Sequence, residues 1–263
     1  MIIDGRKIAG SILGRLRKLP QPREILAAVL VGQNPASVSF LKQKEKAAKS
    51  LGVAFKLYKL PSTVGAPELK RKIISLNRHP KIGGIIIQLP LPKKMNQSEM
   101  INLIGSHKDV DALKSSKRFL SPTVGTLKEI LKAIKFNFEN KKAVVVGRGF
   151  LVGQPIADWL RDKVQLLTIT DKDNFGTALK AADLVVTGVG KPALITGSLI
   201  KKGSVIVDFG YSVTGRGLKR RVSGDVDFLS CQRKAAFITP TPGGTGPIVV
   251  AQLFENFYKL TRE

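Results

Sequence analysis

The sequence of 263 residues contains a single cysteine, Cys231, and this scarcity excludes several kinds of protein. One cysteine forms neither an intrachain disulfide nor a metal cluster held by thiolates, and no paired base near Cys231 indicates a nucleophile. No apolar run reaches the roughly 20 residues that span a bilayer. The first residues, MIIDGRKIAG, lack the apolar core of a signal peptide. We therefore expect a cytoplasmic protein that does not enter a membrane.

Acidic residues are also scarce, with 19 Asp and Glu against 44 Lys and Arg, so the formal net charge is +25. Such an excess favours anionic partners, including nucleic acid, phosphorylated cofactors and polyanionic metabolites. The lysines are spread along the whole chain, without a basic tail or a zinc-finger spacing, which favours a generally basic surface over a nucleic-acid site. The two histidines, His79 and His107, have no metal-ligand spacing, and we expect no metal site.

Apolar runs alternate with helical patterns in the first half of the chain. Alternation of this kind predicts a mainly parallel sheet covered by helices. The predicted strands span residues 25–31, 53–57 and 84–87, and the predicted helices span 35–51, 66–78 and 97–104.

The second half has the pattern of a doubly wound dinucleotide-binding domain. It opens with a predicted helix at 124–135, and the loop PTPGGTGPI at 240–248 leads into a final helix at 249–260 that is apolar on one side. The fold class predicted for the whole chain is α/β with two domains. The predicted strands of this half span 143–146, 165–169, 184–186, 205–208 and 236–238.

A glycine-rich stretch follows the strand at 143–146. Gly147, Arg148 and Gly149 end the strand, and Gly153 follows four residues after Gly149. Such glycines let the backbone approach a pyrophosphate and aim a helix N-terminus at it. The spacing is G-x-G-x-x-x-G rather than G-x-G-x-x-G, so alone it is a weak indication of a dinucleotide site.

Polar residues follow other predicted strands, where open α/β sheets place their ligands. Lys44 lies on the helix after VGQNPAS, and Gln88 ends the apolar strand of IIIQLPLP. Asp109 and Asp111 alternate along an extended segment, so only one of them points into a cleft. The segment ITPTPGGTGP indicates either close approach of the backbone to a ligand or a tight corner. Each feature alone has a structural explanation, since a lysine is usually a solvated charge.

Taken together and in order, these segments resemble the methylenetetrahydrofolate dehydrogenase/cyclohydrolase (FolD) family. The resemblance runs through IIDGRKIA, VLVGQNPAS, QLPLP, KDVD, VVVGRGFLVGQP, ADLVVTGVGKP, GDVDF and ITPTPGGTGP. It implies a catalytic folate domain over residues 1–119, completed by a C-terminal helix at 244–263, and a Rossmann-like NAD(P)-binding domain over 120–243. We expect the folate in the cleft between the domains. A homodimer is implied by the family alone.

The resemblance also implies a reaction of one-carbon metabolism. NADP oxidises 5,10-methylenetetrahydrofolate, and water then opens the methenyl product to 10-formyltetrahydrofolate. Lys44 is implied as the acid/base of the hydrolysis, Gln88 as the residue that holds and tunes Lys44, and Asp111 as the partner of the pterin. A lysine that acts near neutral pH needs its proton affinity lowered by desolvation or nearby positive charge. The implied substrate-binding residues are Phe40, Pro242, Gly243 and Gly244, and the implied cofactor-binding residues are Gly147, Arg148, Gly149, Gly153, Lys172 and Tyr211.

The chain departs from the family at several of these positions. Phe40 stands where the family usually has tyrosine, so a monofunctional dehydrogenase without efficient cyclohydrolase is an alternative. The net charge of +25 leaves a non-catalytic binding protein for RNA or other anions as a second alternative. Gly149 replaces a serine, and Tyr211 replaces an isoleucine that contacts the cofactor. Lys42, Lys46 and Lys49, close to Lys44 in sequence, suggest contacts to a polyglutamylated folate.

The residues after the strand at 165–169 bear on the choice of cofactor. An acid such as Asp171 often binds the ribose 2'-hydroxyl of NAD and repels a 2'-phosphate. Arg148 and Lys172 are cations that suit the 2'-phosphate of NADP. We expect NADP, with NAD as the alternative.

Overall fold

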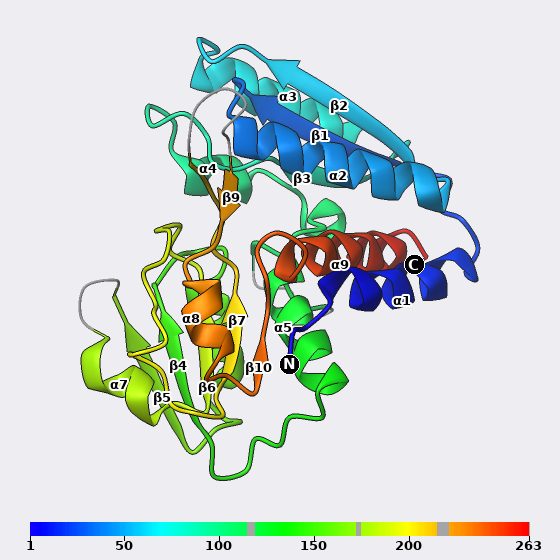
Figure 1. Cartoon of the computed structure of the whole chain (residues 1–263). Coiled ribbons are helices and arrows are strands. Elements are labelled where there is room, and N and C mark those ends of the chain that lie inside the picture. The colour runs from blue at the N-terminus through cyan, green and yellow to red at the C-terminus, as the bar shows by residue number, and fades with distance from the viewer. Residues whose placement is uncertain (115–118, 172–174, 215–220, 263) are drawn as a thin grey trace. The chain divides into compact units, whose positions relative to one another are not determined.

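The computed structural model describes residues 1–114, 119–171, 175–214 and 221–262 (Figure 1). The chain has a two-domain α/β fold, as predicted, and divides into two compact units. The three-stranded unit consists of residues 10–122 and 250–263, and the five-stranded unit consists of residues 1–9 and 123–249. All three boundaries between the units fall inside helices, namely α1 (Gly5–Arg17), α5 (Pro122–Ala133) and α9 (Thr245–Leu260).

The sheet of the three-stranded unit has the order β2-β1-β3, and all its strands are parallel. The chain passes from the central β1 to β2 on one side and then crosses to β3 on the other side, which creates a switch point between β1 and β3. The elements of this unit are β1 (Ile25–Val31), α2 (Pro35–Leu51), β2 (Ala54–Leu60), α3 (Ala66–Arg78), β3 (Ile82–Ile87), α4 (Gln97–Asn102) and the 3-10 helix η1 (Ser106–Lys108).

Local sequence explains where α2 begins and ends. The Asn34 side chain accepts hydrogen bonds from the backbone N–H groups of Ala36 and Ser37, which cap the helix. Gly52 ends it in the left-handed conformation that glycine adopts without strain. The helix therefore starts four residues after β1 ends, near the carboxyl edge of the sheet.

Residues 250–260 of α9 complete the core of the three-stranded unit. The side chains of Phe254, Phe257 and Tyr258 are buried. A Cβ on Gly84 of β3 would lie 2.8 Å from the Phe257 ring, so only glycine fits there. The Asn256 amide donates hydrogen bonds of 3.0 Å to the carbonyls of two preceding segments, at Val110 and Leu120.

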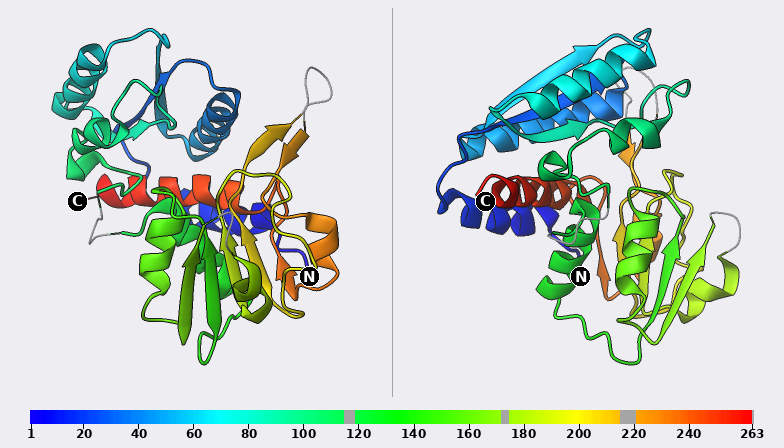
Figure 2. Two further views of the ribbon diagram at one scale, coloured as in Figure 1. Left: turned by 90° about the vertical axis from the view of Figure 1, so that its left-hand side faces the viewer. Right: turned by 180° about the vertical axis from the view of Figure 1, so that it is seen from behind.

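The five-stranded unit has the strand order β10-β7-β6-β4-β5, all parallel (Figure 2). In order of appearance this is the doubly wound arrangement 2-1-3-4-5, whose switch point lies between β4 and β6. Its strands are β4 (Lys142–Val146), β5 (Leu166–Thr170), β6 (Leu184–Thr187), β7 (Val205–Asp208) and β10 (Phe237–Ile238), its helices are α5 (Pro122–Ala133), α6 (Gly153–Leu160), α7 (Gly176–Ala181) and α8 (Phe228–Gln232), and an antiparallel pair is formed by β8 (Ser212–Thr214) and β9 (Arg221–Ser223).

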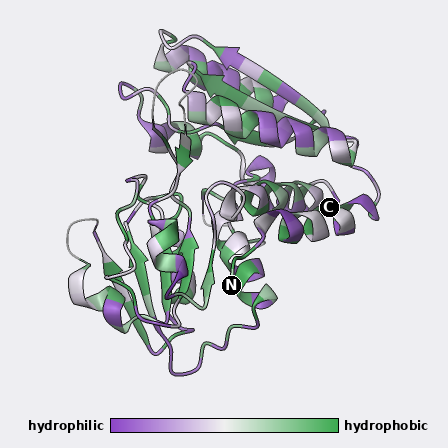
Figure 3. Cartoon of the chain, viewed as in Figure 1, coloured by the Kyte–Doolittle hydropathy of each residue, from purple (hydrophilic) through white to green (hydrophobic). Residues whose placement is uncertain are grey.

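The central strands of both sheets are predominantly apolar (Figure 3). All of β6 and β7 is buried, as is β1 after its first residue. Burial on both faces explains why these strands read as continuous apolar runs. Among the described residues, none of the helices is both long and apolar enough to cross a membrane.

Most predicted elements match the structure, and several ends differ. The predictions at 25–31, 35–51, 66–78 and 205–208 agree residue for residue with β1, α2, α3 and β7. The final helix begins at Thr245 rather than 249, because Pro247 lies in the first turn, where its missing N–H forfeits no helical bond. The domain boundaries implied by the family resemblance stay a prediction.

Candidate active site

Lys44 is buried, unlike a solvated surface lysine. It lies on α2 with 6% of its surface exposed. Its Nζ donates a hydrogen bond of 3.1 Å to Oε1 of Gln88. Burial lowers the pKa of Lys44, and the nearby carboxylate of Asp111 opposes that shift. The neutral amine is therefore more accessible than it is in water.

Gln88 directly follows β3, at the switch point between β1 and β3. Its backbone N–H donates to the carbonyl of Val29, 2.9 Å away, which fixes the residue beside β1. Its side-chain Nε2 donates to the carbonyl of Leu89, also at 2.9 Å. Because the amide nitrogen is used in this way, Oε1 is the atom left to receive Lys44.

The segment KDVD brings Asp111 to Lys44, but through a turn rather than the extended segment expected from the sequence. Asp109 pairs with Ile85 in an isolated bridge, and the N–H of Ala112 then donates to the Asp109 carbonyl at 3.2 Å. The prediction of alternating positions was therefore wrong. Asp109 is buried inside the turn and Asp111 is half-buried, so the two carboxylates still differ in exposure.

Lys108, the first residue of KDVD, anchors this turn to the end of α3. Its buried ammonium donates to the carbonyls of Leu76 (3.3 Å), Asn77 (2.6 Å) and His79 (3.0 Å). Carbonyls in the last turn of a helix lack helical partners, so a cation there is favourable. Burial lowers the pKa of Lys108. Sequence reasoning missed this residue, and its place in front of two aspartates was the only available signal.

Asp109 is a buried acid that closes the turn. Its Oδ2 accepts the backbone N–H of Lys114 at 3.2 Å, whereas its Oδ1 has no hydrogen-bond partner among the described residues. Burial, and then the charge of Asp111, raises the pKa of Asp109 to about 6. Burial also raises the pKa of Asp111, and Lys44 opposes that shift. The amine and its neighbouring carboxyl groups thus have proton affinities displaced toward neutral pH.

Phe40 lies one helical turn before Lys44, on the same side of α2. Its side chain is half-buried. Lys42, Lys46 and Lys49 are exposed. Offsets of two or five residues turn the helix by roughly 140–200°, so these three lysines lie on the side of α2 away from Lys44. Their closeness to Lys44 in sequence therefore does not carry over to space.

The glycine turn after β4 requires glycine at two of its three positions. Gly147 has a φ of 98°, in the region that favours glycine. A Cβ on Gly153 would overlap the carbonyl oxygen of Gly147, whereas a Cβ on Gly149 would meet no heavy atom within 4 Å. Gly153 begins α6, so the turn leads directly into a helix N-terminus.

The turn lies at the switch point of the five-stranded sheet. A Cβ on Gly147 would lie 3.1 Å from Val189, and one on Gly188 would lie 2.6 Å from Val152. The loops after β4 and β6 therefore pack against each other without room for further side chains. A close-fitting backbone beside a helix N-terminus suits the pyrophosphate of a dinucleotide.

Of the other predicted cofactor residues, the structure describes Arg148 and Tyr211. Arg148 contacts Asp171 (Nε to Oδ1, 3.5 Å) and donates to the carbonyl of Ile169 at 3.2 Å. Tyr211 is half-buried and precedes Ser212, whose hydroxyl donates to the Gly190 carbonyl at 2.8 Å in the loop after β6. Lys172 lies outside the described residues.

The loop before α9 holds Pro242, Gly243 and Gly244 in the five-stranded unit. Gly243 has a φ of 101°. Gly244 is buried, donates its N–H to the carbonyl of Pro240 at 2.9 Å, and has the Cβ of Thr239 only 2.8 Å from where its own would lie. Pro242 is exposed. Gly243 is thus favoured by its backbone conformation, and Gly244 by the lack of space for a side chain.

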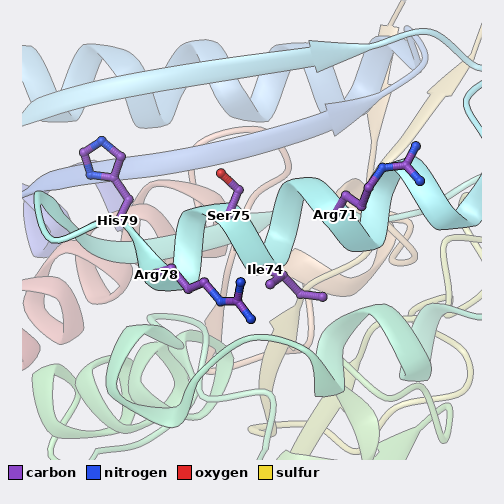
Figure 4. Close-up of a pocket in the computed structure, with 5 residues that line it drawn as sticks. All are labelled: Arg71, Ile74, Ser75, Arg78 and His79. Atoms are coloured by element: carbon purple, nitrogen blue, oxygen red, sulfur yellow. The ribbon is translucent and has the colours of Figure 1, made fainter.

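Other candidate positions carry no comparable arrangement. Cys231 is buried, and burial raises the pKa of its thiol to about 11, which disfavours the nucleophilic thiolate. A pocket of about 440 Å³ lies along α3 (Figure 4), but its lining side chains come from one helix and its end and point to different sides. Its lining residues are Arg71, Ile74, Ser75, Arg78 and His79. Within the described part of the chain, no group of His, Cys, Asp or Glu is placed to hold a metal ion.

A doubly wound parallel sheet with a glycine turn at its switch point is the architecture of dinucleotide-dependent α/β enzymes. Two family models match the chain. The catalytic domain of tetrahydrofolate dehydrogenase/cyclohydrolase matches residues 3–111, and the NAD(P)-binding domain of the same enzyme matches residues 121–263. The chain belongs to the tetrahydrofolate dehydrogenase/cyclohydrolase family.

Individual relatives and solved structures of this family are similar to the chain over nearly its full length. The bifunctional protein FolD of Thermodesulfovibrio yellowstonii is 36% identical, covering 97% of this chain and 94% of that protein. The FolD protein of Moorella thermoacetica is 35% identical, with coverage of 99% and 98%. The Trypanosoma brucei methylenetetrahydrofolate dehydrogenase-cyclohydrolase, solved with NADP and an inhibitor, has a TM-score of 0.94 at 28% identity, with coverage of 100% and 97%. The Campylobacter jejuni enzyme has a TM-score of 0.90 at 31% identity, with coverage of 100% and 98%.

Proposed function

We propose that this chain oxidises 5,10-methylenetetrahydrofolate to 5,10-methenyltetrahydrofolate with NADP and hydrolyses the product to 10-formyltetrahydrofolate. The observation that carries the proposal is the buried Lys44, hydrogen-bonded to Gln88 and close to the carboxylate of Asp111. Two relatives are named bifunctional protein FolD, and the name of the solved Trypanosoma brucei relative includes both activities and a bound NADP. These findings favour the bifunctional interpretation over the monofunctional dehydrogenase and over the non-catalytic anion-binding protein.

The oxidation needs an acceptor for the hydride of the folate bridge carbon, which NADP would supply when bound. The chain contributes position, which is the main requirement of hydride transfer. Gly147, Gly149 and Gly153 form the turn that we assign to the pyrophosphate, and Arg148 is a cation for the phosphates. Tyr211 and Lys172 are further proposed cofactor residues, the latter from sequence alone.

In the hydrolysis, a water oxygen forms a bond to the methenyl carbon and gives up a proton. The bond from that carbon to N5 then breaks, and N5 keeps the electron pair and takes up a proton. The hydroxyl that came from the water gives up its proton as it becomes the formyl carbonyl, so one proton is released overall. Lys44 is the group that we assign to these proton transfers, because burial lowers its pKa and so brings it closer to neutral pH than that of a lysine in water. Gln88 orients the amine, and Asp111 accepts hydrogen bonds from the donor-rich edge of the pterin.

We assign folate binding to the catalytic domain, residues 1–119 with the helix at 244–263, and dinucleotide binding to residues 120–243. Phe40, Pro242, Gly243 and Gly244 are the further proposed substrate-binding residues. We also propose a homodimer, on the family resemblance, and a polyglutamylated substrate, on the net charge of +25. Sedimentation of the purified protein tests the first, and folates of different tail length at low salt test the second.

The function is tested by measuring oxidation and hydrolysis separately. We expect oxidation of methylenetetrahydrofolate with a higher initial rate for NADP than for NAD, and hydrolysis of the methenyl compound well above its spontaneous rate. Lys44→Met is expected to lower hydrolysis by about 10²–10⁴-fold, the usual contribution of an acid/base group. Lys42→Met is the matched control, because Lys42 is exposed on the other side of the same helix.

Each failure has a distinct meaning. Wild-type hydrolysis at the spontaneous rate, with oxidation intact, would leave a monofunctional dehydrogenase, and recovery of hydrolysis in Phe40→Tyr would assign the loss to the missing hydroxyl. Absence of oxidation with either cofactor, together with salt-dependent binding of nucleic acid, would replace the enzyme by the binding protein.

A further inference from the structure

Two buried carboxylates in the five-stranded unit take no part in the chemistry described above. Asp225, in the segment GDVDF after β9, is 0% exposed, and Asp208, at the end of β7, is 2% exposed. A buried carboxylate is costly unless hydrogen bonds compensate it. The partners of these two groups therefore indicate what they stabilise.

Asp225 binds three donors, one at the end of β6 and two in the loop that follows it. Its Oδ2 accepts the hydroxyl of Thr187 at 2.9 Å and the N–H of Val189 at 2.6 Å. Its Oδ1 accepts the N–H of Lys191 at 2.8 Å. Both oxygens of one carboxylate thus hold a five-residue loop, and two of the three bonds fix backbone rather than side chains.

Asp208 fixes the segment that carries Asp225. Its Oδ1 accepts the N–H of Gly210 at 2.7 Å and that of Asp225 at 3.2 Å, and its Oδ2 accepts the N–H of Val226 at 3.0 Å. A Cβ on Gly224 would lie 2.8 Å from Oγ1 of Thr241 and would also overlap the Asp208 carboxylate. The backbone of residues 224–226 is thus packed against the Asp208 carboxylate, which fixes the position of Asp225.

The loop held by Asp225 forms one side of the switch point. Val189 is the side chain that a Cβ on Gly147 would meet, and Gly188 packs on Val152. The Asp225 carboxylate therefore determines how far the loop after β6 stands from the glycine turn after β4. In a doubly wound sheet this spacing defines the crevice that receives the dinucleotide.

We propose that Asp225 is a positioning residue for the dinucleotide, which holds the backbone of residues 187–191 at the spacing that the bound cofactor requires. The inference rests on the proposed function. It extends that function to a residue that acts through the backbone of residues 187–191 and not by contact with the cofactor or the folate. A loop fixed in advance does not have to be ordered when the cofactor binds, so affinity is gained by preorganisation. Loss of the carboxylate then weakens cofactor binding more than it weakens chemistry in the saturated enzyme.

The test uses Asp225→Asn, which keeps the size of the side chain but replaces one acceptor oxygen by an NH2 group that faces a donor. We expect the Kd and the KM for NADP to rise at least tenfold, with kcat within about threefold of wild type and the KM for the folate unchanged. Thr187→Val removes only the hydroxyl donor, and we expect a two- to fivefold rise in the Kd for NADP. This milder variant keeps the hydrogen bonds from the backbone N–H groups of Val189 and Lys191. It therefore still tests the proposal if Asp225→Asn does not fold.

Ser204→Ala is the control for a purely structural effect. Ser204 is buried in the same unit, and its hydroxyl donates to the Lys201 carbonyl at 2.8 Å, at the opposite end of β7 from Asp208. We expect this variant to lower the Tm without changing the Kd for NADP. If Asp225→Asn and Thr187→Val lowered the Tm in the same way and bound NADP as wild type does, the positioning role would be overturned. A wild-type protein that bound NADP but oxidised no folate would instead contradict only the proposed function.

Discussion

At the scale of single residues, we expect Asp171 to influence the choice between NADP and NAD. It lies directly after β5, and its carboxylate holds the guanidinium of Arg148 at 3.5 Å. A 2'-phosphate placed near Arg148 meets this carboxylate as a like charge and as a competitor for the same cation. The carboxylate therefore works against NADP even in a site that otherwise suits it.

Replacing Asp171 by asparagine is expected to favour NADP. The change removes a negative charge and releases Arg148, so we expect the ratio of kcat/KM for NADP to that for NAD to rise about five- to tenfold, which corresponds to roughly 1–1.4 kcal/mol. Steady-state kinetics with both cofactors measure the ratio. Asp158→Asn is the control, since Asp158 is another exposed acid of the same unit, on α6 and paired with Arg161. An unchanged ratio in Asp171→Asn would show that Asp171 does not sense the 2'-phosphate.

Asp109 gives the folded protein a distinct dependence on pH. Its pKa is raised from 3.8 to about 6, so the folded state binds the proton more tightly than the unfolded state does. Its contribution to stability is therefore fully present below the unfolded pKa and is lost as the pH rises through 6, a total of about 3 kcal/mol. Asp208, with a pKa raised to about 7 by burial and by the charge of Asp225, acts in the same direction.

This linkage predicts how Asp109→Asn changes the unfolding curve. Between about pH 5 and about pH 7.5, wild type should lose about 1.4 kcal/mol more of its free energy of unfolding than the variant does. Urea unfolding at the two pH values measures the difference, and a variant with the dependence of wild type would contradict the raised pKa. The variant isolates Asp109, because Asp208 and the other acids are common to both proteins.

At the scale of elements, the glycine turn between β4 and α6 needs glycine at position 153 but not at position 149. A side chain on Gly153 would overlap the Gly147 carbonyl, whereas one on Gly149 would meet open space. We expect Gly153→Ala to lower the free energy of unfolding by about 1–3 kcal/mol, as overpacking does, and to weaken NADP binding at least tenfold. Gly149→Ala is the matched control and should stay within about 0.5 kcal/mol of wild type, as surface changes usually do.

Thermal unfolding and NADP titration of both variants check this expectation. Equal losses in the two variants would show that the whole turn, rather than the contact of Gly153 with Gly147, limits the site. Gly149→Ser is informative as well, since the open space accepts the hydroxyl that the family usually carries there.

The elements that sequence predicted best are those with local causes. The helix α2 has an asparagine cap, a proline in its first turn and a terminal glycine, all of which are readable from neighbouring residues. The turn that carries Asp111 is different. It is fixed by Lys108, which reaches carbonyls of α3 about 30 residues earlier in the chain. No periodicity records such a contact, so the segment read as extended and its anchor was missed.

At the scale of the whole molecule, the sequence predicted the α/β class and the parallel strands but not the strand order. Order depends on hydrogen bonds between distant segments, such as those that place β1 between β2 and β3. The same holds for the site. Lys44 and Gln88 came together in the prediction only through the family resemblance, because 44 residues separate them and neither position is distinctive by itself. The carboxylate of Asp225 was not singled out at all, because its three partners lie about 35 residues earlier in the chain, at the end of another strand and in the loop after it.

Each unit is built from two separate stretches of the chain, so its two parts are synthesised at different times. Residues 10–122 leave the ribosome early, yet Phe254 and Phe257, which fill their core, come after residues 123–249. At ~5–20 residues per second, translation of that insert takes roughly 6 to 25 seconds. During this interval the apolar surface around Gly84 lacks the Phe257 ring that packs on it in the folded protein, so we expect the nascent chain to be prone to aggregation until α9 has been made.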